Sequence, residues 1–289
     1  MIPAAFEYLK PASVEEAIAL LRTHGEDARL LAGGHSLIPL MKLRLASPRY
    51  LIDIGCIRNL AYISEGAGRV CIGALTTHAE IEDSDVLKAR FPLLPEAAAR
   101  IGDAQVRNRG TIGGSLAHAH PAADFPAVLL ALEAEMLLQG PDGRRAVPAL
   151  DFFVSLFTTA LRPDEVLVEI RIPLLPNGMG TAYLKVEDKA SHFAIVGVAA
   201  VIDMDAQGAC RTARVGVTGV AATPYRARSV ESALLNQRPD QPTIEAAAQH
   251  AVEGVQPLPD LFASSDYRAH LAQVYASRAI VQAAGRAGL

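Results

Sequence analysis

The sequence predicts an α+β protein made of two domains. At 289 residues the chain is too long for one small core, and 51% of its residues are apolar, which is enough for a large one. Strand patterns precede helix patterns in the last third of the chain, as in α+β domains. The proline- and glycine-rich segment Pro173 to Gly180 separates this part from the rest and predicts the domain boundary.

Short strands and helices are predicted in the first 75 residues. Ser13 and Glu16 form a capping box that begins a helix, and Gly25 ends that helix. Val14, Ile18 and other apolar residues fall on one face of it. Three apolar segments then predict strands: 28–32, 50–54 and 69–74.

The following hundred residues contain further capping and turn signals. Thr77 and Glu80 form a second capping box, which predicts a short helix. Apolar patterns predict helices at 94–101 and 126–133, with the polar stretch 103–109 between them. The turn residues 141–143 (Pro-Asp-Gly) predict a β-hairpin, and residues 165–172 a further strand.

Beyond the proline-rich segment, strands come first and helices follow. The strand patterns cover residues 181–187, 193–204 and 213–220. The helix patterns cover residues 228–235, 243–253 and 267–284.

Composition and charge exclude several classes of function. The chain has 27 basic and 31 acidic residues, so no basic face for a nucleic-acid partner is expected. No apolar run approaches the roughly 20 residues of a membrane span, and the N-terminus lacks a signal-peptide pattern. We therefore expect a cytoplasmic protein. Its three cysteines have no CxxC spacing, and an iron–sulfur cluster takes about four thiolates, so this chain cannot hold one alone.

Two segments with paired glycines carry the chemistry: 32–36 (Ala-Gly-Gly-His-Ser) and 111–115 (Thr-Ile-Gly-Gly-Ser). Paired glycines permit positive φ, and successive amides in such turns form a concave anion-binding nest. Two such loops facing each other would bind a pyrophosphate, and FAD is a natural occupant. The alternative is an ordinary tight turn in each case, because a lone Gly-Gly pair is a weak motif. The repetition of the pattern favours the dinucleotide.

Longer stretches around these loops carry a resemblance to a known family. Residues 31–37 (Leu-Ala-Gly-Gly-His-Ser-Leu) are followed by 41–45 (Met-Lys-Leu-Arg-Leu), and residues 105–115 (Gln-Val-Arg-Asn-Arg-Gly-Thr-Ile-Gly-Gly-Ser) by 121–124 (Pro-Ala-Ala-Asp). Together they resemble the two FAD loops of the medium, flavin-binding subunits of the molybdenum hydroxylases, the family of xanthine dehydrogenase and aerobic carbon monoxide dehydrogenase. The resemblance covers the whole chain in order.

The resemblance implies a fold and a set of cofactor-binding residues. Residues 1–175 would be an FAD-binding domain of the p-cresol methylhydroxylase type, with two α+β subdomains. Residues 180–285 would be a smaller α+β domain with an antiparallel sheet, of the carbon monoxide dehydrogenase flavoprotein C-terminal type. FAD would lie between the two domains. The implied FAD-binding residues are Ala32, Gly33, Gly34, His35, Ser36, Ile101, Thr111, Ile112, Gly113, Gly114, Ser115, Asp124, Leu161, Lys185 and Phe193.

The resemblance also implies a role for each of these residues outside the loops. Asp124 would accept hydrogen bonds from ribityl or ribose hydroxyls. Ile101 and Lys185 would lie near the flavin, and Phe193 would cover one face of its ring. Leu161 would pack near the adenine or the ring system. The residues themselves leave plainer alternatives open. Asp124 would cap the helix at Pro126, Lys185 would be a strand-surface lysine, and Phe193 a core residue.

His118 and His120 form an HxH pair. Two histidines without a third ligand are a weak metal motif, and no metal site is predicted. Relatives often carry Asp at position 120 and Asn at position 115, and some carry basic residues at positions 187 and 188. These departures change the expected electrostatics at the flavin edge, and with them the choice of electron acceptor. Position 193, which is Phe here, is often Tyr in the family.

The function implied by the resemblance is electron transfer, with no catalytic acid–base residue in this chain. A large molybdopterin subunit would hydroxylate the substrate, and a small subunit with [2Fe-2S] clusters would pass electrons to FAD here. The assembly would be a heterotrimer, doubled to a heterohexamer. The substrate stays open among carbon monoxide, an aldehyde, a purine and an N-heterocycle, and the acceptor among NAD, dioxygen and a quinone. Two alternatives are a stand-alone flavoenzyme of the same fold and a non-catalytic assembly subunit.

Overall fold

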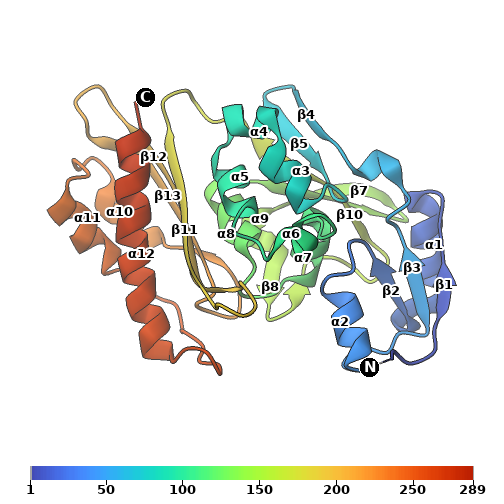
Figure 1. Ribbon diagram of the computed structural model, residues 1–289. Helices are drawn as coiled ribbons and strands as arrows, with labels where there is room; N and C mark the ends of the chain where they lie inside the picture. The colour runs from blue at the N-terminus through green and yellow to red at the C-terminus, as the bar shows by residue number, and fades with distance from the viewer. Residues whose placement is uncertain (1, 289) are drawn as a thin grey trace.

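The computed structural model describes residues 2–288, and it confirms the predicted α+β class (Figure 1). A three-stranded parallel sheet in the order β1-β3-β2 forms the N-terminal part, at the right of the figure. Its core is shared with α1. The elements are β1 (Glu7–Leu9), α1 (Val14–His24), η1 (Gly25–Asp27), β2 (Ala28–Leu31), α2 (Leu37–Lys42), β3 (Tyr50–Asp53) and η2 (Arg58–Leu60).

The middle of the chain forms a five-stranded antiparallel sheet in the order β4-β5-β10-β6-β7. Its strands are β4 (Ile63–Gly66), β5 (Arg69–Gly73), β6 (Glu135–Gly140), β7 (Gly143–Pro148) and β10 (Val166–Pro173). A small hairpin pairs β8 (Phe153–Ser155) with β9 (Thr158–Thr159). The helices of this part are α3 (His78–Asp83), α4 (Asp85–Arg90), α5 (Leu93–Ala98), α6 (Ala104–Arg107), α7 (Ile112–His118), α8 (Asp124–Ala131) and α9 (Ala149–Phe152).

The C-terminal part is an antiparallel sheet with helices on its outer face, at the left of Figure 1. Strands β11 (Gly180–Glu187), β12 (Ala194–Met204), β13 (Cys210–Thr218) and β14 (Tyr225–Arg226) follow one another in the sheet. They pack against α10 (Arg228–Leu234), α11 (Gln241–Ala248) and α12 (Ser265–Arg286). Within residues 2–288, every helix is either too short or too polar to cross a lipid bilayer.

Local sequence signals predicted most element boundaries. The capping box at Thr77 has both of its hydrogen bonds, and Gly25, with φ of 52°, ends α1. The turn 141–143 joins β6 to β7 as expected. Two details differ. The polar stretch 103–109 contains helix α6, which Asp103 caps by accepting from the Val106 N–H. Helix α5 ends at Ala98, three residues earlier than predicted.

Helix α8 lies between the five-stranded part and the C-terminal sheet, and all eight of its residues are buried. It contacts α5 and α7 on one side and β12 and β13 on the other. Gly216 of β13 makes the second contact close, because a Cβ there would overlap the Ala127 carbonyl oxygen of α8. Backbone therefore lies directly on backbone where the two parts meet.

Replacing Gly216 by Ala is expected to destabilise the protein by about 3 kcal/mol, because neither backbone segment can move without separating α8 from β13. Denaturant unfolding measures the change. Gly66→Ala is the matched control, since Gly66 also lies in a strand and a Cβ there meets no atom within 4 Å. Equal effects of the two substitutions would contradict this account of the α8–β13 contact.

Candidate functional site

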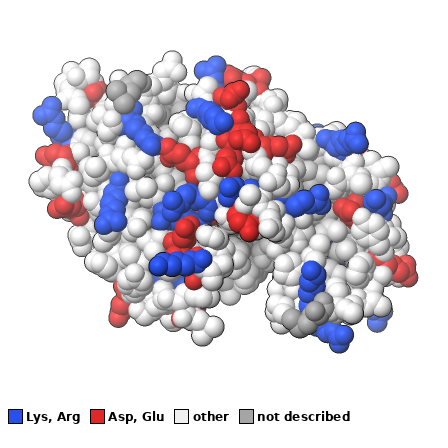
Figure 2. All heavy atoms as spheres, in the orientation of Figure 1, with Lys and Arg blue, Asp and Glu red and all other residues white. Residues whose placement is uncertain are grey.

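The two glycine-pair segments lie side by side. The first, residues 32–36, connects β2 to α2, and the second begins α7. A Cβ on Gly33 would overlap the Arg109 carbonyl oxygen and would lie 2.9 Å from the Gly110 Cα. A Cβ on Gly114 would lie 3.7 Å from the Ala32 Cβ. Figure 2 shows the surface hollowed between the lobe that carries α2 and the main body.

The first segment presents free backbone amides. Gly34 has φ of 81°, a left-handed conformation that glycine adopts without strain. Among residues 2–288, no hydrogen-bond acceptor is found for the N–H groups of residues 33–36. Consecutive free amides of this kind form an anion-binding concavity. Acidic and basic side chains intermingle over the face in Figure 2.

The second segment differs from the predicted nest. Residues 112–118 are helical, with Thr111 as the cap, and neither of its two glycines has a positive φ. Its amides are already bonded: Ile112 donates to the Thr76 carbonyl at 3.0 Å and Gly113 to the Ala74 carbonyl at 2.8 Å. The Gly114 amide donates to the Thr111 hydroxyl at 3.2 Å. The glycines here serve close packing, since a Cβ on Gly113 would lie 2.6 Å from the Ala74 carbonyl oxygen.

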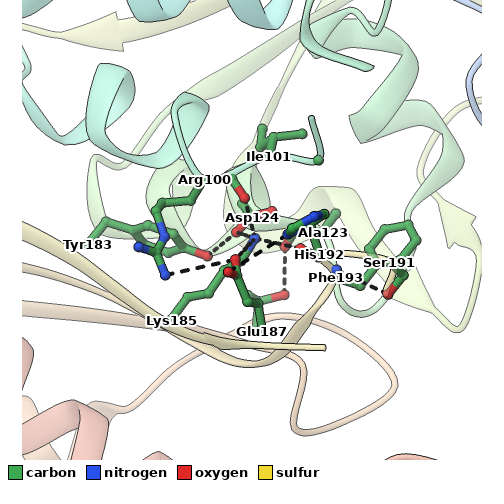
Figure 3. A network of polar contacts seen from close by, with 12 residues as sticks. Arg100, Ile101, Ala123, Asp124, Tyr183, Lys185, Glu187, Ser191, His192 and Phe193 are labelled. Carbon is green, nitrogen blue, oxygen red and sulfur yellow. Dashed lines mark hydrogen bonds and ion pairs between the residues drawn. The ribbon is translucent and has the colours of Figure 1, made fainter. Parts of the chain in front are cut away.

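Asp124 begins helix α8 and is the centre of a buried polar network (Figure 3). Its Oδ1 accepts from the Tyr183 hydroxyl at 2.6 Å and lies 2.9 Å from the Lys185 ammonium. Burial raises the pKa of Asp124, and the positive charge of Lys185 opposes this shift. No hydrogen bond to Oδ2 is found among residues 2–288. The capping alternative does not hold, because Ala123 occupies the cap position and Asp124 makes no capping hydrogen bond.

Lys185 is fully buried on β11, which excludes the strand-surface alternative. Its ammonium donates to the Arg100 carbonyl at 2.6 Å and to the His192 carbonyl at 2.7 Å. Glu187 completes the network, 3.9 Å from Lys185 and 3.8 Å from both Arg100 and His192. Figure 3 shows these side chains converging from β11, from the end of α5 and from the loop between β11 and β12.

Phe193 and three other rings form an aromatic cluster at one end of the network. Phe193 is 42% exposed, so it is not a core residue. It stacks on His120 at 4.2 Å, and His118 and Phe157 extend the cluster. Burial lowers the pKa of His120 to about 4, and its Nδ1 accepts from the Ala122 N–H. No group of three or more metal-binding side chains occurs in the described part of the chain.

The remaining predicted residues lie around this centre. Ile101 and Leu161 are half-buried and pack against the core of the five-stranded part. His35 is exposed at the tip of the first loop. The Val106 N–H donates to Asp103 at 2.8 Å, and this hydrogen bond lowers the pKa of Asp103.

Sequence reasoning missed several members of the site. Tyr183 and Glu187 share one face of β11 with Lys185, and the two-residue spacing within the predicted strand would have shown this. His78 is also buried: its Nδ1 has no partner in the described structure, burial lowers its pKa to about 4, and its ring lies against Gly110. No local pattern around His78 indicates this placement.

Two family models match the chain. Residues 4–175 match the FAD binding domain in molybdopterin dehydrogenase, and residues 181–283 match the CO dehydrogenase flavoprotein C-terminal domain. Among similar proteins, the carbon monoxide dehydrogenase medium chain of Hydrogenophaga pseudoflava is 45% identical, with 97% of each chain covered. The 6-hydroxypseudooxynicotine dehydrogenase complex subunit alpha of Paenarthrobacter nicotinovorans is 40% identical, with 99% of this chain and 97% of that protein covered.

Solved structures agree with these matches. A chain of the Hydrogenophaga pseudoflava carbon monoxide dehydrogenase that lacks the Mo-pyranopterin moiety superposes with a TM-score of 0.96 at 46% identity, covering 99% of this chain and 100% of that one. A chain of quinoline 2-oxidoreductase from Pseudomonas putida 86 gives a TM-score of 0.93 at 35% identity, with 99% of each chain covered. This chain therefore belongs to the FAD-binding medium subunit family of the molybdenum hydroxylases.

Proposed function

We propose that this chain receives electrons on a bound FAD from the iron–sulfur clusters of a partner subunit and delivers them to an external acceptor. The main support is the row of free amides at residues 33–36, which lies beside α7. These residues fall within the part of the chain that matches the FAD-binding family model. FAD, when bound, supplies the redox chemistry, and the protein supplies binding, orientation and electrostatics.

The residues present fit this cofactor. We propose that the free amides of the first loop hold the pyrophosphate, and that Gly114, which has no side chain, leaves space for it beside Ala32. Asp124 Oδ2 would accept from a ribityl or ribose hydroxyl. Ile101 and Phe193 would flank the flavin ring. The full proposed set is Ala32, Gly33, Gly34, His35, Ser36, Ile101, Thr111, Ile112, Gly113, Gly114, Ser115, Asp124, Leu161, Lys185 and Phe193.

The proposed partners are a large molybdopterin subunit and a small iron–sulfur subunit, in a doubled heterotrimer in the cytoplasm. Two observations support the placement of the molybdopterin and the iron–sulfur clusters on subunits other than this chain. The related proteins carry the names of a medium chain and a complex subunit. The three cysteines are free, and the described residues contain no cluster of metal-binding side chains. We further propose that residues 1–175 and 180–285 are the two domains, with FAD between them.

Native purification followed by cofactor analysis tests the proposal. We expect denaturation to release FAD from this chain, and iron and molybdopterin from companion chains, identified by absorbance and mass. FAD on a solitary chain that turns over a substrate would instead indicate a stand-alone oxidoreductase. A chain that carries no flavin and takes none up from solution would refute the electron-transfer role.

Gly114→Val is expected to abolish FAD binding, because the side chain would enter the space beside Ala32. The fold should lose only about 1 kcal/mol, since the new Cβ lies 2.8 Å from the Thr111 hydroxyl and disturbs one helix cap. Flavin content per chain and denaturant unfolding are the measurements.

Gly285→Val is the control for Gly114→Val. Gly285 is also helical, and a Cβ there meets no atom within 4 Å. Full flavin content in the Gly114 variant would show that α7 does not line the cofactor site.

A further inference from the structure

We infer that Lys185 is a positioning residue, whose buried ammonium fixes the two walls of the flavin site. The walls are Ile101 and Phe193, the two residues proposed to flank the flavin ring, and the position proposed for the ring between them is called here the flavin slot. That the slot holds a flavin depends on the proposed function. That Lys185 links the two walls depends only on contacts within this chain.

The geometry of the ammonium carries the inference. Lys185 Nζ donates to the carbonyl of Arg100 at 2.6 Å and to that of His192 at 2.7 Å. These two carbonyls belong to the residues that directly precede Ile101 and Phe193. One side chain therefore connects both walls, although they are about 90 positions apart in the sequence. Figure 3 shows Lys185 between the two segments.

Lys185 has no hydrogen-bond donor left for a ligand. An ammonium group carries three N–H donors. Two reach the carbonyls of Arg100 and His192, and the third is directed to Asp124 Oδ1 at 2.9 Å. The side chain is also 0% exposed. A direct bond to the flavin would therefore require one of these three contacts to break.

Neighbouring residues hold the ammonium of Lys185 in place, and the ammonium in turn stabilises the backbone conformation of His192. Tyr183 donates to the same Asp124 oxygen, which fixes the carboxylate opposite Lys185. His192 has a left-handed φ of 58°, an uncommon conformation for a residue with a side chain. Its carbonyl bond to Lys185 helps to hold this conformation. Phe193 also stacks on His120, so this wall is fixed from both sides.

Hydrogen exchange in the full chain stripped of FAD tests the inference directly. Lys185→Met, and the double variant Lys185→Met with Asp124→Asn, both remove the carbonyl bonds. The double variant also avoids leaving a buried carboxylate without its cation. We expect amide exchange in segments 99–102 and 190–194 to rise about tenfold or more, the effect of losing a hydrogen bond to a charged group. The other segments should exchange as in the wild type.

The control is Lys189→Met, because Lys189 is exposed on the same loop and lies outside the network. It should leave both segments unchanged. Unchanged exchange at both walls in the folded Lys185 variants would overturn the inference. So would faster exchange throughout the chain in both variants, because Lys185 would then stabilise the core as a whole.

A second readout uses the purified complex with FAD bound. A loosened slot should expose the flavin, so iodide should quench its fluorescence more strongly in Lys185→Met, which keeps Asp124, than in the wild type and in Lys189→Met. Equal quenching would count against the inference. A wild-type complex without FAD would refute the proposed function. The role of Lys185 would then be decided by the hydrogen-exchange result, which is obtained without the cofactor.

Discussion

The complete burial of helix α8 is the constraint on which the rest of the structure depends. A helix with no exposed residue must be covered on every side, and here α5 and α7 cover one side while β12 and β13 cover the other. The first residue of α8 is Asp124, which therefore lies where the two parts of the protein meet. A carboxylate in such a place needs partners, and Tyr183 and Lys185 of β11 provide them. The packing of one helix thus determines where a polar site can form.

The polar groups of the site divide into those that bond to one another and those that remain free. Asp124 Oδ1, Tyr183 and Lys185 bond within the protein and set the shape of the site before any ligand binds. The amides of residues 33–36 and Asp124 Oδ2 have no partner in the described structure. A site that binds a large cofactor in one orientation is expected to combine two kinds of polar group: side chains already fixed by bonds within the protein, and donors and acceptors left free for the ligand.

The sequence predicted features that depend on near neighbours and missed those that depend on distant ones. The capping box at Thr77 and the turn at 141–143 involve residues a few positions apart, and both were correct. The second glycine pair reads much like the first, yet it lies in the first turn of a helix, where carbonyls of residues 74 and 76 accept its amides. The acceptors of Lys185 are backbone carbonyls, which no residue type in a sequence can indicate. The cofactor contacts of individual residues stay a prediction from the family resemblance.

The position of α8 has a consequence for how the chain is synthesised. Helix α8 leaves the ribosome well before strands β12 and β13, which begin at residue 194. Until those strands follow, the apolar side of α8 that they will cover, including Ala127 opposite Gly216, has no neighbour within the nascent chain. Exposed apolar surface makes unfinished chains prone to aggregation, so the last third of the chain protects α8 as soon as it has folded onto it.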